Sequence, residues 1–197
     1  MSCTELAKRL QERSGARTAL FSNGFHYDFR SIDDKGKSFS RGQHEYYRPC
    51  GYRRLALNVV DLYANNDWLG PLNGSRPRGE TADYGEWAVA YHGTELDNAL
   101  SIARNGFDHG YSVRQKLGKG VYTTPEVRVA EFYARQKGTF SWNDERYIIL
   151  VQLRVRPEAI HRHVVKEDCP PCTNGCIYWR VEDIRDLRPY GLCIKCV

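Results

Sequence analysis

The amino-acid sequence predicts an α+β fold, with a split, mostly antiparallel β-sheet core and short helices. Several strand-like segments follow one another in the second half of the chain, and only short helical segments separate them. The 197 residues have the length of one domain that is large enough to bury a core. Hydrophobic residues make up 41% of the chain and charged residues 27%, which is typical of a globular protein rather than a disordered one.

Residues 1–45 are expected to form an N-terminal helix and an irregular extension. Ser2 and Glu5 have the spacing of a capping box, and Gly15 marks the end of the helix. The apolar residues that repeat there at helical spacing are Leu6, Ala7 and Leu10. Residues 21–50 have no sustained period, but their many aromatic rings argue against disorder, because such rings usually pack on something.

Residues 46–197 are expected to form the main domain. Its first strand is predicted to be half-buried, because apolar residues alternate at Leu55, Leu57 and Val59. A long loop rich in glycine, proline and asparagine is predicted over residues 65–85. The later strands are predicted over residues 87–92, 147–155, 177–181 and 190–195.

Two short helices are expected between these strands. Thr94, with an acidic residue three positions later, has the pattern of a helix N-cap, and Gly106 has that of a helix end. Thr124 before Pro125 predicts the start of the second helix, since proline fits the first helical turn. The predicted inner stripes are Leu96, Ala99, Leu100 and Ala103 in the first helix, and Val127, Ala130 and Ala134 in the second.

The charge pattern favours a solvated surface over a nucleic-acid groove. The net charge is +5, and the arginines and lysines are scattered along the chain. No apolar run approaches the length of a membrane span, and residues 1–25 lack the apolar centre of a signal peptide. A cytoplasmic or nuclear protein that does not contact a membrane is therefore expected, with nucleic-acid binding as the minor alternative.

Residues 87–134 combine side chains that suit a flat ring joined to a ribose. His92 stands beside Gly93 at a predicted strand end, and Tyr122 precedes Tyr133 by eleven residues across a strand-to-helix turn. Cleaving the nicotinamide–ribose bond of NAD creates positive charge on the ribose, so a site for it must hold the ribose and the ring. His92 suits the ribose, the Gly93 backbone the carboxamide, and the tyrosines the ring. Each motif taken alone is more typical of ordinary core residues than of a binding site. The occurrence of both motifs in this order favours an NAD site.

These motifs resemble the catalytic domain of poly(ADP-ribose) polymerase-like ADP-ribosyltransferases. The family's histidine-glycine-serine/threonine motif matches His92–Thr94, and its glycine-x-glycine-isoleucine/valine-tyrosine motif matches Gly118–Tyr122. The resemblance implies an ADP-ribosyltransferase-like fold with NAD as the substrate. It implies catalytic roles for His92, Tyr122 and Ile177, and NAD-binding roles for His92, Gly93, Thr94, Tyr122, Ala130 and Tyr133. Four further segments resemble a little-characterised eukaryotic subgroup, namely 47–51, 67–70, 85–87 and 188–191.

Two positions depart from the family pattern. Ala130 stands where the family has a serine that bonds the nicotinamide amide. The missing hydrogen bond is expected to weaken nicotinamide binding by on the order of 1 kcal/mol. Ile177 stands where polymerases have the glutamate that activates an acceptor hydroxyl. Glu182 lies an odd number of residues further on, so it is expected on the other side of the strand. The histidine-tyrosine-isoleucine pattern implies transfer of single units or inactivity.

The resemblance thus implies a mono-ADP-ribosyltransferase, a glycosyltransferase that moves ADP-ribose from NAD to an acceptor. The acceptor is expected to be a protein, or less readily a nucleic-acid end. The alternative is a catalytically inactive relative that keeps the fold as a module binding NAD, ADP-ribose or a protein. Incorporation of labelled ADP-ribose separates the two.

No bound metal is expected to be needed for this chemistry. Four cysteines nevertheless have the spacing C-x2-C-x20-C-x2-C, at the edge of structural zinc patterns. They are Cys169, Cys172, Cys193 and Cys196, with Cys176 as a spare ligand. We favour reduced thiols over a zinc site or a disulfide framework, because an alternating strand would direct Cys193 and Cys196 to opposite faces. His161 and His163 are expected on the surface.

Overall fold

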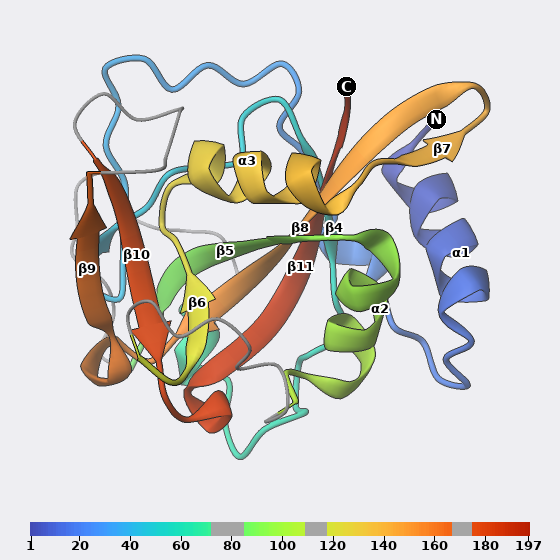
Figure 1. The fold of residues 1–197 in the computed structure, drawn as a ribbon. Coiled ribbons are helices and arrows are strands. Elements are labelled where there is room, and N and C mark those ends of the chain that lie inside the picture. The colour runs from blue at the N-terminus through green and yellow to red at the C-terminus, as the bar shows by residue number, and fades with distance from the viewer. Residues whose placement is uncertain (72–84, 109–117, 167–174) are drawn as a thin grey trace.

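Two antiparallel β-sheets dominate the protein (Figure 1). The computed structural model describes residues 1–71, 85–108, 118–166 and 175–197. Within these residues, every paired strand is antiparallel, and short helices lie around the larger sheet. The predicted α+β class with a mostly antiparallel sheet is therefore confirmed.

The larger sheet carries the core. Its strands follow the order β1 (Tyr27–Asp28), β4 (Arg53–Ala56), β11 (Leu187–Cys196), β8 (Glu145–Val155) and β5 (Ala88–Thr94), and β7 (Phe140–Trp142) pairs with β8. Residues 147–155 of β8, where a strand was predicted, are all buried, and the strand gives way to a short 3-10 turn at Pro157. The sequence did not indicate β7, which lies outside its predicted strands.

The smaller sheet is separate, as the predicted split requires. Its order is β6 (Val121–Thr123), β10 (Cys176–Val181) and β9 (His161–Val165), and a two-stranded ribbon joins β2 (Ser40–Arg41) to β3 (His44–Glu45). One isolated bridge links the two main sheets, between Tyr91 of β5 and Thr124 after β6. The sequence did not indicate β9; His161 is exposed on it, as expected, whereas His163 is half-buried.

Capping explains where α1 (Cys3–Ser14) begins and ends. The Ser2 hydroxyl accepts a hydrogen bond from the Glu5 N–H at 3.1 Å, and Gly15 adopts the left-handed conformation with φ of 64°. The predicted apolar stripe is buried. Together with Leu20 and Phe21, this helix belongs to the same hydrophobic core as the large sheet, so the N-terminal 45 residues fold as part of the main body.

The other two helices begin later than the sequence pattern suggests. Thr94 belongs to β5 and is buried, so α2 (Leu96–Asn105) starts after Glu95 and ends at Gly106 as predicted. Helix α3 (Val127–Lys137) follows Glu126, because the Thr124 side chain is engaged in hydrogen bonds before the helix. Its Val127, Ala130 and Ala134 pack with the main core, as predicted, and the buried Val129 packs in a second cluster.

The strand expected to be half-buried is covered on both faces. Leu55 and Ala56 are neighbours on β4 and are 0% and 4% exposed, although neighbouring side chains of a strand point to opposite faces. The strand ends at Ala56, and Leu57 then donates its N–H to the Tyr190 carbonyl. The described residues also form short 3-10 segments at Asn23–Phe25, Asp67–Leu69, Pro157–Ala159 and Ile184–Asp186. No helix among the described residues is both long and apolar enough to span a bilayer.

Gly93 lets α3 pack directly on β5. A Cβ atom at this position would lie 1.9 Å from the Ala130 carbonyl oxygen and 2.8 Å from the Ala134 nitrogen. Both atoms belong to the helix backbone and cannot turn away. The glycine therefore fixes the distance between α3 and the end of β5.

We expect Gly93→Ala to destabilise the protein by about 1–3 kcal/mol, the usual cost of overpacking a core. Gly24→Ala is the control, because a Cβ there meets nothing within 4 Å. The free energy of unfolding, measured with denaturant for both variants, checks this. Equal stability of the two variants would contradict the close packing of α3 on β5.

Candidate functional site

The segment Thr124–Glu126 joins the smaller sheet to the larger one. The N–H and carbonyl of Tyr91 bond the carbonyl and N–H of Thr124 at 2.7 and 3.0 Å. The Thr124 hydroxyl donates to the Ile177 carbonyl at 2.7 Å, and the Glu126 carboxylate accepts from the Ile177 N–H at 2.9 Å. Strands β5 and β10 and the start of α3 are thus held at one place. We call this segment the junction.

The junction leaves the backbone of Gly93 at an open strand edge. Strand β5 has β8 on one side, and Thr124 bridges its other side at Tyr91. Because backbone groups two residues apart point to the same side of a strand, the N–H and carbonyl of Gly93 point away from β8, as those of Tyr91 do. Among the described residues, none pairs with Gly93 on that side. One donor and one acceptor are therefore presented together.

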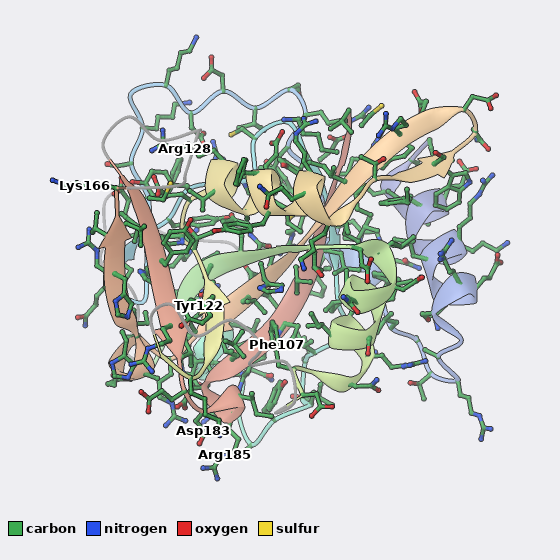
Figure 2. The ribbon with its side chains drawn as sticks, in the orientation of Figure 1. Phe107, Tyr122, Arg128, Lys166, Asp183 and Arg185 are labelled. Atoms are coloured by element: carbon green, nitrogen blue, oxygen red, sulfur yellow. The ribbon has the colours of Figure 1, made fainter. Side chains whose placement is uncertain are left out.

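His92 is held in one tautomer. Its Nδ1 lies 2.9 Å from the Tyr122 carbonyl oxygen, and because a carbonyl can only accept, Nδ1 carries the proton. The ring of Phe107 meets the imidazole edge-on, with centroids 5.5 Å apart. Tyr122 and Phe107, both labelled in Figure 2, thus hold the imidazole from two elements.

The electrostatics of His92 favour the neutral ring. Burial lowers the pKa of His92 from its usual 6.5, and the bond to the Tyr122 carbonyl opposes this only in part. With Nδ1 protonated, the neutral ring has an acceptor at Nε2. No described residue bonds that atom. His92 can therefore accept a hydrogen bond from a ligand hydroxyl.

Tight backbone packing positions Tyr122. Gly120 has a φ of +148°, and a Cβ there would lie 2.6 Å from the Val181 carbonyl oxygen, so only glycine fits. The Tyr122 hydroxyl donates to the Gly118 carbonyl. Val121 is buried in the main core, so the half-buried Tyr122 side chain lies on the opposite face of β6.

Two tyrosines of the smaller sheet lie on its outer face, and a third, from α3, contacts one of them. Tyr122 is paired with Arg180 across β6 and β10, and Tyr178 lies two residues before Arg180 on the same face. The Tyr178 hydroxyl lies 3.0 Å from the Tyr133 hydroxyl of α3, with ring centroids 6.1 Å apart. We call Tyr122, Tyr133 and Tyr178 the tyrosine face.

Ile177 does not belong to this face. Its side chain packs against the main core, whereas Cys176 and Tyr178 pack in a second cluster with Val129 and Tyr133. The residue of β10 that reaches Tyr133 is therefore Tyr178, one position later. The sequence could not show which residue of β10 reaches Tyr133, because the alternation of side chains along β10 does not reveal which side of the strand meets the core.

Two other residues that were expected to bind NAD are buried in the protein. Ala130 is 1% exposed and packs in the main core, so its methyl group does not line the tyrosine face. Thr94 is buried at the end of β5.

Glu182 lies on the side opposite to Ile177, as expected, and its carboxylate binds the Arg180 guanidinium at 2.6 Å. That side is the one with the tyrosine face.

The cysteines are only partly described. Cys169 and Cys172 lie outside the described residues. Cys193 is buried and Cys196 exposed, in agreement with opposite faces of β11, and burial raises the pKa of the Cys193 thiol to about 12. Such burial opposes formation of the thiolate that zinc requires. Cys176 is disulfide-bonded, which differs from the expected reduced thiol. The described ranges contain no group of three or more residues able to hold a metal ion.

We expect NMR to find His92 protonated at Nδ1 and titrating below pH 6.5, because burial disfavours its charged form. Long-range ¹H–¹⁵N spectra of the imidazole over pH 4–8 measure both properties. A ring protonated at Nε2 in the neutral form, or a pKa above 6.5, would contradict the described hydrogen bond to Tyr122.

No model of a known protein family matches this chain, and no curated protein matches it either. The resemblance to poly(ADP-ribose) polymerase-like ADP-ribosyltransferases therefore stays a prediction from the sequence motifs.

Proposed function

We propose that His92, Gly93 and the tyrosine face bind NAD, and that the protein transfers single ADP-ribose units from NAD to a protein acceptor. The observation that carries this proposal is the open edge of β5. There the N–H and carbonyl of Gly93 lie next to His92, whose Nδ1 is bonded to the Tyr122 carbonyl. A site for nicotinamide riboside needs these groups side by side.

The carboxamide of nicotinamide is matched by Gly93. A primary amide both donates and accepts, so it can form two hydrogen bonds with the N–H and carbonyl of one residue. The lack of a Cβ also lets α3, which carries Tyr133, approach that edge closely. Tyr122 and Tyr133 then provide aromatic faces for the ring.

The ribose is matched by His92. Its Nε2 is an acceptor at neutral pH, so a ribose hydroxyl can donate to it. Holding the ribose while positive charge develops on it favours cleavage of the nicotinamide bond. Because the pKa of His92 is lowered, this acceptor persists at pH 7 and is lost only as the pH falls through that lowered value.

Tyr178 supports transfer of single units rather than chain growth. From β10, a phenol and not a carboxylate reaches Tyr133. The nearby Glu126 is buried, and its carboxylate is occupied by the Ile177 N–H and Arg128. Neither residue is placed to activate an acceptor hydroxyl as a free carboxylate would.

The lack of a free carboxylate at Tyr178 and Glu126 also favours a second candidate function. Because the Glu182 carboxylate on the side of the tyrosine face is also bound, by the Arg180 guanidinium, the chain can act as a module that binds NAD or ADP-ribose, or a protein, and does not transfer ADP-ribose. The proposed acceptor is a protein; a nucleic-acid end is the alternative acceptor. Either function would operate in the cytoplasm or the nucleus. Neither requires a bound metal, and a zinc site at Cys169, Cys172, Cys193 and Cys196 is not part of the proposal.

We expect His92→Ala to weaken NAD binding about tenfold, the loss of roughly one hydrogen bond, and to abolish transfer of labelled ADP-ribose. The matched control is His26→Ala, because the Nδ1 of His26 also bonds a backbone group, the Ala56 N–H at 3.1 Å, on the larger sheet. Calorimetry measures NAD binding, and gels measure the label.

Three outcomes of this experiment decide between the functions. Binding and labelling that both depend on His92 support the transferase, and binding without label or nicotinamide release supports the module. Equal NAD affinity of the two variants, with a large loss of stability in His92→Ala, would make His92 a core residue and contradict both.

We expect any transferred ADP-ribose to remain a single unit, because β10 presents Tyr178 and Ile177 where elongation needs a glutamate. Treatment of the labelled product with a hydrolase specific for mono-ADP-ribose should remove all label. Polymer ladders on a gel would contradict this role of β10.

A further inference from the structure

A second site lies at the end of the larger sheet, away from the tyrosine face. There residues of β4, β8 and β11 near the C-terminus line a pocket of about 330 Å³. None of its lining residues belongs to the tyrosine face or the junction. The charged residues that line it are Arg30, Arg53, Lys195 and Glu145.

Arg53 is a buried cation in the wall of this pocket. Its side chain lines the pocket although the residue is only 8% exposed. Its Nε is buried without a hydrogen-bond partner, and no described residue forms an ion pair with the guanidinium. An unpaired buried charge is costly, so native proteins pair such a group with an opposite charge.

The nearest acid is already occupied. Asp28 faces Arg53 across β1 and β4, but its two carboxylate oxygens accept from the Arg30 guanidinium at 2.6–3.0 Å. The Glu145 carboxylate of the pocket binds the Tyr147 hydroxyl, and burial together with that bond raises the pKa of Tyr147 to about 12. Asp28 attracts Arg53 through space, but neither acid binds the Arg53 guanidinium directly.

The other two cations do not remove the need for an anion. The Lys195 ammonium is bound by the Glu131 carboxylate of α3 at 3.0 and 3.2 Å. Arg30 uses Nε and one terminal nitrogen for Asp28, which leaves N–H donors on its other terminal nitrogen. Two guanidinium groups with remaining donors thus line one pocket. Planar forks of this kind suit an anion with several acceptor oxygens.

We propose that this pocket binds the phosphate group of a small ligand, with Arg53 as its main partner and Arg30 as the second. A dianion with three acceptor oxygens matches two guanidinium groups better than a single carboxylate does. The volume of about 330 Å³ is at the small end of the range for small-molecule sites, so a small phosphate monoester fits. The proposal shares no residue with the proposed NAD site.

Inorganic phosphate is the probe for this site. At constant ionic strength, phosphate should raise the melting temperature of the wild-type protein over chloride, and by more than acetate does. Arg53→Met should bind phosphate at least tenfold more weakly. Arg17→Met is the control with the same charge change, because Arg17 is exposed and does not line the pocket.

Two further variants test the site even if Arg53→Met fails to fold. Glu145→Gln removes the exposed acid of the pocket and should tighten phosphate binding, whereas Arg53→Lys keeps the charge but loses the fork and should weaken it. In the wild type, amide shifts on phosphate addition should centre on residues 51–53 and 194–196. All variants should bind NAD as the wild type does.

Three results would overturn the proposal. They are the absence of phosphate binding by the wild type, an equal loss of binding in Arg17→Met and Arg53→Met, and amide shifts centred away from the pocket. Equal protection by acetate would overturn the assignment to phosphate. A failure of NAD binding leaves this test unaffected, because the two sites are measured with different ligands.

Discussion

The geometry of the protein depends on the junction at Thr124–Glu126. One short segment bonds the edge of β5 through Tyr91 and also bonds both backbone groups of Ile177 on β10. Because Glu126 is the residue directly before α3, the same segment sets where that helix begins. Four elements that carry His92, Tyr122, Tyr133 and Tyr178 are thereby brought together from distant parts of the chain.

Two glycines extend this constraint. Gly93 brings the α3 backbone onto β5, and Gly120 brings β6 close to the end of β10. A side chain at either position would push an element of the site away. The proposed NAD site therefore depends on close backbone approach as much as on its polar side chains, and it includes the open edge that the junction leaves at Gly93. Edges of this kind are where a ligand can take the place of a strand.

The two proposed sites lie on different sheets. The tyrosine face lies on the smaller sheet, whereas Arg53 lines a pocket at the far end of β4, β8 and β11. Glu131 of α3 connects their surroundings, since its carboxylate binds both the Tyr52 hydroxyl and the Lys195 ammonium. Helix α3 therefore has one face toward the proposed NAD site and contacts with the strands that form the pocket.

The sequence by itself determined the features that depend on neighbouring residues. The Ser2 cap and Gly15 end of α1, the buried strand β8 and the α+β class all follow from local pattern, and so does the order of His92, Tyr122 and Tyr133. Tertiary structure decided which face of β10 meets the core, so Tyr178 and not Ile177 reaches Tyr133. It also decided the proton position on His92, the later start of α2 and the burial of Arg53 in the wall of the pocket. Alternation reveals that neighbouring side chains point to opposite sides, but only the pairing of strands and helices decides what each side meets.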